Sequence, residues 1–236
     1  MLRKLNSLVI PAAVLTSMLL IATIVGPASA ASKLQFPSSV IKQLSAKWWQ
    51  WAFSFSTENS PLSDTSGERC NKGDVGKVFF LAGTAGPISS TQTRDCTISH
   101  KDSILIPIAN VACVLGNACD VYTSPVLPKP TNTKELKEQV SSVADRVTLT
   151  EATITIDGQT VKLSPDRIQS PLFKTTVVPN NPLGEPPIKN AVAFADGYWV
   201  LLKPLSIGEH TLHFKGVFDL GQDDFVTELT YHITVV

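Results

Sequence analysis

The chain has 236 residues, and its 20 lysines and arginines balance its 20 aspartates and glutamates. No basic stripe is present, which argues against a nucleic-acid partner. Both methionines, Met1 and Met18, lie in the first 30 residues, so the rest of the chain excludes a blue-copper site with an axial methionine. No second long apolar run follows these residues, and we expect no membrane span in the mature chain.

The first 30 residues have the organisation of a secretion signal. A basic pair, Arg3-Lys4, precedes the apolar residues 8–25 and an A-x-A cleavage site at Ala28-Ser29-Ala30. An uncleaved membrane anchor is the alternative, but Pro11 and the small residues favour cleavage near Ala30. We therefore expect a secreted or extracytoplasmic protein in which residues 31–236 form one compact β-rich domain.

Four cysteines follow the signal, and an oxidising compartment favours disulfide bonds between them. Three pairings are possible, and we expect Cys70–Cys96 and Cys113–Cys119. The chain-entropy model gives each bond about 2–4 kcal/mol of stabilisation. A metal site is the alternative, but no CxxC spacing occurs and His100 is the only histidine nearby.

Apolar residues at three- and four-residue steps predict a helix over Ser38–Phe55. Its sequence Trp48-Trp49-Gln50-Trp51 places three indoles in about one turn, so they cannot all face one core. We favour a helix that anchors itself on a sheet through these rings. The alternative is a ligand platform that exposes a ring such as Trp49.

Two apolar runs, Lys77–Thr84 and Ser103–Leu115, indicate strands that are buried on both faces. Pro107 interrupts the second run and must lie at an edge or a bulge, because it has no N–H for a sheet hydrogen bond. These strands, the first helix and the disulfide loops make up residues 31–130.

A second helix is expected within residues 131–147. Asn132 can cap it, with Glu135 three residues on, and apolar residues line one face.

The strongest hairpin signals lie in residues 148–236, which resemble an immunoglobulin-like module in strand pattern. Asp157-Gly158 and Asp196-Gly197 each separate two apolar segments, and glycine there takes a positive φ at no steric cost. We expect a hairpin turn at both. The segment Ser164–Lys189 is proline-rich and is expected to be irregular.

Two strands are expected to follow the second hairpin. A turn around Pro204 and Gly208 leads into the alternating segment Glu209–Lys215, and the chain ends in the alternating segment Val226–Val236. Together the elements predict a mainly β fold: an antiparallel β-sandwich, immunoglobulin-like or jelly-roll-like, with two accessory helices.

No G-x-S-x-G, H-E-x-x-H, Walker or dinucleotide fingerprint occurs, and we assign no catalytic residue. Acidic residues and a histidine beside the predicted strands could still supply acid–base catalysis. These residues are Glu58, Asp64, Asp95, His100 and Asp102.

Metal binding is also weighed and not favoured. His213 and His232 could meet across neighbouring strands, but two ligands on an open face make a weak site. Asp219, Asp223 and Asp224, followed by Glu228, could bind calcium, yet the EF-hand spacing is missing and a solvated loop is the simpler interpretation. We expect no metal and no cofactor.

Tyr198 and Trp199 follow Asp196-Gly197 on opposite faces of a strand. One of them, with Trp49, could stack on a sugar ring or a partner, although core packing is their usual fate.

The chain resembles a group of secreted microbial proteins without assigned activity. The matching pieces run in order through most of the mature chain: Trp48-Trp49-Gln50-Trp51-Ala52, Asn59-Ser60-Pro61, Gly67 with Cys70, Val78-Phe79-Phe80-Leu81-Ala82-Gly83-Thr84, Cys96, Pro107-Ile108 with Asn110, Asp196-Gly197-Tyr198-Trp199, and Pro204-Leu205-Ser206 with Gly208-Glu209-His210-Thr211. The resemblance implies an exported domain with a Cys70–Cys96 bond, and it carries no activity or site residue.

The sequence thus favours an exported, non-enzymatic protein that binds at or near the cell surface, to a surface component or a glycan. The alternative is a secreted hydrolase that uses loop carboxylates and His100.

Overall fold

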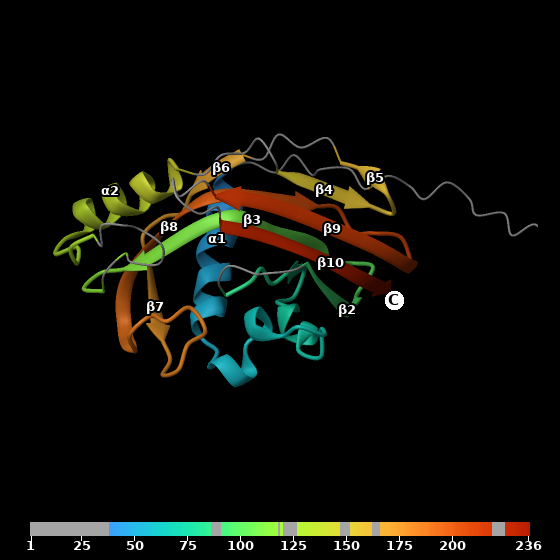
Figure 1. Ribbon diagram of the computed structural model, residues 1–236, viewed down its shortest axis with the longest axis horizontal. Helices are drawn as coiled ribbons and strands as arrows, with labels where there is room; N and C mark the ends of the chain where they lie inside the picture. The colour runs from blue at the N-terminus through green and yellow to red at the C-terminus, as the bar shows by residue number, and fades with distance from the viewer. Residues whose placement is uncertain are drawn as a thin grey trace, which may run out of the picture.

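The computed structural model describes residues 38–85, 91–117, 119, 127–146, 152–161, 166–218 and 225–236 (Figure 1). The expected signal at residues 1–30 lies outside this part of the chain. Asp219, Asp223 and Asp224 of the calcium hypothesis also lie outside it.

The described chain is mainly β. Its strands are β1 (Val78–Phe80), β2 (Gln92–Ile98), β3 (Ser103–Val114), β4 (Thr153–Ile156), β5 (Gln159–Thr160), β6 (Asp166–Gln169), β7 (Phe173–Val177), β8 (Ile188–Leu202), β9 (Gly208–Phe218) and β10 (Phe225–Val235). The helices are α1 (Ser38–Phe53), α2 (Thr133–Ala144) and three short 3-10 helices, η1 (Thr57–Asn59), η2 (Pro61–Ser63) and η3 (Cys70–Gly73). Among the described helices, none combines the length and the apolar character that crossing a membrane requires.

The strands form two sheets of five. Sheet A has the order β1-β3-β8-β6, with β7 also paired to β8, and sheet B has the order β2-β10-β9-β4-β5. Most neighbours are antiparallel, but β1 runs parallel to β3 and β2 runs parallel to β10. The expectation of purely antiparallel sheets was therefore wrong. A parallel pair cannot be joined by a tight turn, and the chain meets this limit by visiting the other sheet between the two partners.

Three apolar layers hold the molecule together. The core between the sheets includes Ile106, Val200, Phe214 and Ile233. On the opposite face of sheet A, α1 packs through its tryptophans. The second helix, α2, packs on the face of sheet A that also carries sheet B. It covers β3 near Cys113 and β8 near Phe194, next to sheet B (Figure 1).

Several local predictions are confirmed. The Asn132 carboxamide oxygen accepts the N–H groups of Lys134 and Glu135, which caps α2 as expected. Asp157 and Gly158 both have positive φ, 51° and 75°, and form the two-residue turn between β4 and β5. The register between β3 and β8 shifts at Pro107, so this proline does lie at a bulge.

The expected hairpin at Asp196-Gly197 was wrong, because β8 runs unbroken through both residues. A Cβ on Gly197 would lie 2.4 Å from the Cα of Asn110 on β3. The glycine is therefore required by the close approach of two backbones beside the bulge and not by a turn. The turn around Pro204 and Gly208 does exist, and it carries the chain from β8 in sheet A to β9 in sheet B.

Three strands were not foreseen. The segment before β3 contains β2, which pairs with the C-terminal strand β10. The proline-rich segment that was expected to be irregular contains β6 and β7, and both pair with β8.

Replacement of Gly197 by alanine should destabilise the fold by about 2–3 kcal/mol, because the added methyl group must displace the β3 backbone. The matched control is Gly83→Ala, where a Cβ would meet only a proline side-chain atom at 3.7 Å. Urea unfolding of both variants measures the difference. An equal loss in the two variants would contradict the close-approach explanation.

Candidate functional site

A buried arginine joins the two sheets at one edge of the sandwich. Arg94 on β2 is only 2% exposed and points inward. Its Nη1 donates to the Tyr231 hydroxyl at 2.9 Å and to the Gly83 carbonyl at 3.2 Å, and its Nη2 donates to the Gln92 side chain at 2.9 Å. Tyr231 in turn donates to the Ala82 carbonyl at 2.8 Å. Sheet B thereby bonds to the segment that follows β1 of sheet A.

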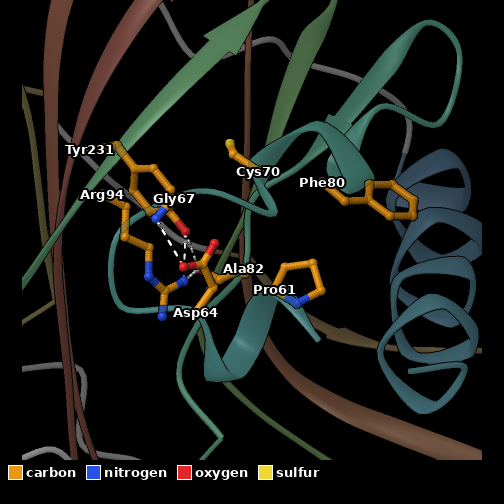
Figure 2. A pocket seen from close by; sticks show the side chains of 8 residues that line it. All are labelled: Pro61, Asp64, Gly67, Cys70, Phe80, Ala82, Arg94 and Tyr231. Carbon is orange, nitrogen blue, oxygen red and sulfur yellow. Dashed lines mark hydrogen bonds between the residues drawn. The ribbon is translucent and has the colours of Figure 1, made fainter. Parts of the chain in front are cut away.

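These groups line a small cavity with the segment that contains η2 and η3 (Figure 2). Its volume is about 10 Å³, which is the room that one water molecule needs. The lining residues are Pro61, Asp64, Gly67, Cys70, Phe80, Ala82, Arg94 and Tyr231. A substrate of ordinary size does not fit, so we interpret this place as a polar junction rather than an active site.

Asp64 holds the covering segment in shape. Its carboxylate accepts the backbone N–H groups of Ser66, Gly67 and Arg69 at 2.7–3.0 Å. Burial would raise the pKa of Asp64, but these hydrogen bonds outweigh burial and hold the pKa below its usual value. Burial also raises the pKa of Tyr231, which keeps this hydroxyl a donor. The Cys70–Cys96 disulfide, expected from the sequence, ties the same segment to β2.

The acidic residues and the histidine considered for catalysis have separate partners and positions. Asp64 caps its loop, and Asp95 faces outward, where its carboxylate lies 3.3 Å from His232. His100 contacts the Val236 carbonyl through Nδ1 at 2.8 Å. Asp102 is buried in the connection between β2 and β3. Burial, followed by the charge of Asp74, raises the pKa of its carboxyl. Glu58 lies on η1, in a separate segment.

The histidines considered for metal binding share one face but have separate partners. His213 pairs with Glu228 at 3.1 Å and His232 pairs with Asp95. Among the described residues, no group of three or more histidine, cysteine, aspartate or glutamate side chains is arranged to hold a metal ion. The Cys113–Cys119 bond, also expected, occupies the remaining two cysteines.

The aromatic side chains proposed for binding lie mostly in the core. Trp49 and Trp199 are 6% and 1% exposed, and Tyr198 is half-buried. The rings of Trp48 and Trp199 contact each other between α1 and sheet A. The tryptophans therefore anchor the helix, as the favoured interpretation had it, and they form no exposed patch.

A second polar junction fastens α2 to sheet A. Asp196 on β8 is 0% exposed, and its carboxylate accepts two hydrogen bonds of 2.9 Å from Arg167 on β6. Arg167 also donates to Asp145 at the end of α2 and to the Ser141 carbonyl. Gln169 donates to Asp196 as well. Asp196, in the Asp-Gly pair that was expected to form a turn, is thus the buried member of an ion pair with the partly exposed Arg167.

A third junction resembles a catalytic triad. His210 Nδ1 lies 2.8 Å from the Asp157 carboxylate, and Nε2 lies 3.3 Å from the Ser206 hydroxyl. Nε2 is closer to the Ser206 carbonyl oxygen, at 2.9 Å. A carbonyl only accepts, so in the doubly protonated ring the Nε2 hydrogen is directed to it, and that form of the imidazole has no lone pair to activate the hydroxyl. The sequence reasoning missed this contact, because its residues are 53 positions apart.

The outer face of sheet B is a regular polar surface that spans five paired strands. It consists of Thr93, Asp95 and Thr97 on β2, Glu228, Thr230, His232 and Thr234 on β10, Glu209, Thr211, His213 and Lys215 on β9, Thr153 and Thr155 on β4, and Thr160 on β5. These side chains alternate with the buried residues of the inter-sheet core, such as Leu229 and Tyr231.

One cross-strand row crosses this face completely. Thr93, Thr230, His213, Thr155 and Thr160 are successive ladder partners. With strands about 4.8 Å apart, the row is about 19 Å long. It places two threonine hydroxyls on each side of the central His213 and is the candidate functional site.

Comparison with known proteins gives no relative: no family model, no curated protein and no solved structure matches the chain.

Removal of the Tyr231 hydroxyl should cost about 2 kcal/mol, because Tyr231→Phe leaves the buried Ala82 carbonyl and one Arg94 N–H with fewer partners. Tyr198→Phe is the matched control, because its hydroxyl makes no hydrogen bond to a described residue. Thermal unfolding followed by circular dichroism measures both. A similar small change in the two variants would show that the junction contributes little.

The variant Asp196→Asn should lose about 3 kcal/mol of stability, since it leaves the Arg167 guanidinium without its buried counter-charge. The control Asp145→Asn removes the exposed partner of the same arginine and should cost less than about 1 kcal/mol. Guanidinium-induced unfolding is the measurement, and the reverse order of the two losses would refute the assignment.

Proposed function

We propose that this protein is an exported, non-enzymatic β-sandwich protein that binds a polysaccharide of the cell surface through the outer face of sheet B. The observation that carries the proposal is the unbroken row from Thr93 to Thr160 across all five strands.

The chemistry of threonine supports this choice. Each hydroxyl both donates and accepts a hydrogen bond, as the hydroxyls of a sugar chain do. The β-branched side chain has few rotamers, so little conformational entropy is lost when it binds. No hydrogen bond within the described chain uses the hydroxyls of Thr155 or Thr230, which leaves both available to a ligand.

The composition of the face argues against a protein partner. Stable protein interfaces have apolar or aromatic centres. Four of the large hydrophobic residues that are exposed in the described chain, Val40, Val75, Leu172 and Ile207, lie outside the strands of sheet B, and the fifth, Val236, lies at the end of the chain beyond the threonine row. A regular polar surface is better suited to a repeating, hydroxylated polymer.

Two further features are in keeping with export. The described chain contains two disulfides, Cys70–Cys96 and Cys113–Cys119, and such bonds persist in oxidising compartments. The signal at residues 1–30 and the resemblance to secreted microbial proteins favour the same location. Within this proposal the fold is a sandwich of the immunoglobulin-like or jelly-roll-like kind, which presents one sheet face to a ligand.

The double variant Thr155→Val/Thr230→Val tests the face. It keeps side-chain shape and strand propensity and removes two hydroxyls, so binding to envelopes of the producing cells should weaken about tenfold. Thr133→Val, on an exposed position of α2, is the matched control and should bind normally. Sedimentation of the mature protein with washed envelopes gives the affinity.

Treatment of the envelopes identifies the partner. Periodate, which oxidises vicinal diols, should abolish binding, and protease digestion should leave it intact. The opposite pattern, or equal binding by the double variant and the wild type, would overturn the proposal.

A further inference from the structure

We propose that His210 is a pH-responsive latch, which when doubly protonated holds the β8–β9 connection, residues 203–207, against the β4–β5 turn. This inference concerns the fold itself and does not depend on the proposed function.

The latch is defined by two contacts of one buried ring. His210 is 8% exposed and points inward at the start of β9. Its Nδ1 faces the Asp157 carboxylate of the β4–β5 turn, and its Nε2 faces the Ser206 carbonyl of the connection. Asp157 also accepts the Thr211 N–H at 2.8 Å, which fixes the carboxylate in place.

Proton counting shows why the contacts respond to pH. A carboxylate and a carbonyl only accept hydrogen bonds, so both contacts exist together only when both ring nitrogens carry hydrogen. A neutral imidazole has one N–H and must leave one acceptor without it. Loss of one proton therefore breaks the hydrogen bond to Asp157 or the one to the Ser206 carbonyl. If Nδ1 keeps its hydrogen, Nε2 can only accept the longer contact from the Ser206 hydroxyl, 3.3 Å away.

The surroundings favour the charged ring. Asp157 from the turn faces His210, Glu209 contributes its charge from the opposite face of the same strand, and β10 places the apolar Ile233 opposite. Burial lowers the pKa of His210, but the hydrogen bonds to Asp157 and Ser206 and the two acidic charges outweigh burial, so the pKa is raised above its ordinary value.

The direction of the pH effect follows from this shift. A raised folded-state pKa stabilises the fold fully below the unfolded value of about 6.5. The stabilisation disappears as the pH rises through the higher folded pKa. The connection should therefore open as the pH rises through this raised pKa, and Ile207, already 70% exposed, lies beside the released contact.

Residues on either side limit the opening. Leu205 is buried in the core between the sheets, so the movement is confined to the peptide groups around Ser206 and Ile207. The connection joins sheet A to sheet B, and its release loosens one crossover without separating the sheets.

NMR titration of the intact mature protein tests the latch. The His210 Cε1–H signal should titrate above 6.5, and Asp157→Asn should lower its midpoint by about one pH unit. Asparagine keeps the positive-φ turn, so the hairpin is retained. The control Asp95→Asn removes the acidic partner of the exposed His232 and should leave the His210 midpoint unchanged.

Hydrogen exchange gives the second readout. After correction for intrinsic base catalysis, amide exchange at residues 206–208 should accelerate at least about fivefold across the His210 titration, while amides in the centre of β10 stay protected. A His210 midpoint at or below 6.5 in the wild type, or unchanged protection of residues 206–208 across the titration, would overturn the proposal.

Discussion

A charge that is buried must be solvated by polar groups of the protein itself, and this constraint shapes the whole sandwich. Arg94 is solvated by backbone carbonyls and by Tyr231, and these hydrogen bonds connect sheet B to sheet A. Asp196 meets the constraint with Arg167, and so attaches α2 to sheet A. His210 meets it with Asp157, and so ties a hairpin to the connection between the sheets. Each junction links elements that are far apart in the sequence.

The same constraint explains what the titratable residues considered for catalysis do in the part of the chain that the structure describes. The carboxylate of Asp64 is occupied by backbone N–H groups, and the imidazole of His210 directs its hydrogen to a carbonyl. The tryptophans that could have formed a ligand platform fill the layer between α1 and sheet A. On the outer face of sheet B, Thr155 and Thr230 keep hydroxyls that no other described residue uses, which is why we propose binding there.

Local signals in the sequence predicted local structure well. The cap at Asn132, the turn at Asp157-Gly158 and the bulge at Pro107 depend on neighbouring backbone groups, and all three are confirmed. The turn predicted at Asp196-Gly197 was wrong, because both residues interact with segments that are distant in the sequence. Asp196 is the counter-charge of Arg167, and Gly197 leaves room for the β3 backbone.

The pairing of strands that are distant in the sequence could not be predicted, because it depends on residues outside any local pattern. The pairing of β2 with β10 joins segments more than a hundred residues apart, and no local pattern marks it. Without β2, the inward direction of Arg94 could not be inferred, and neither could the threonine row. The most direct test of the account is an NMR shift map with oligosaccharides released from the envelope of the producing cells. We predict shifts confined to the threonines and histidines of the outer face of sheet B; shifts centred on α1 or on the Arg94 junction, or none at saturating ligand, would contradict it.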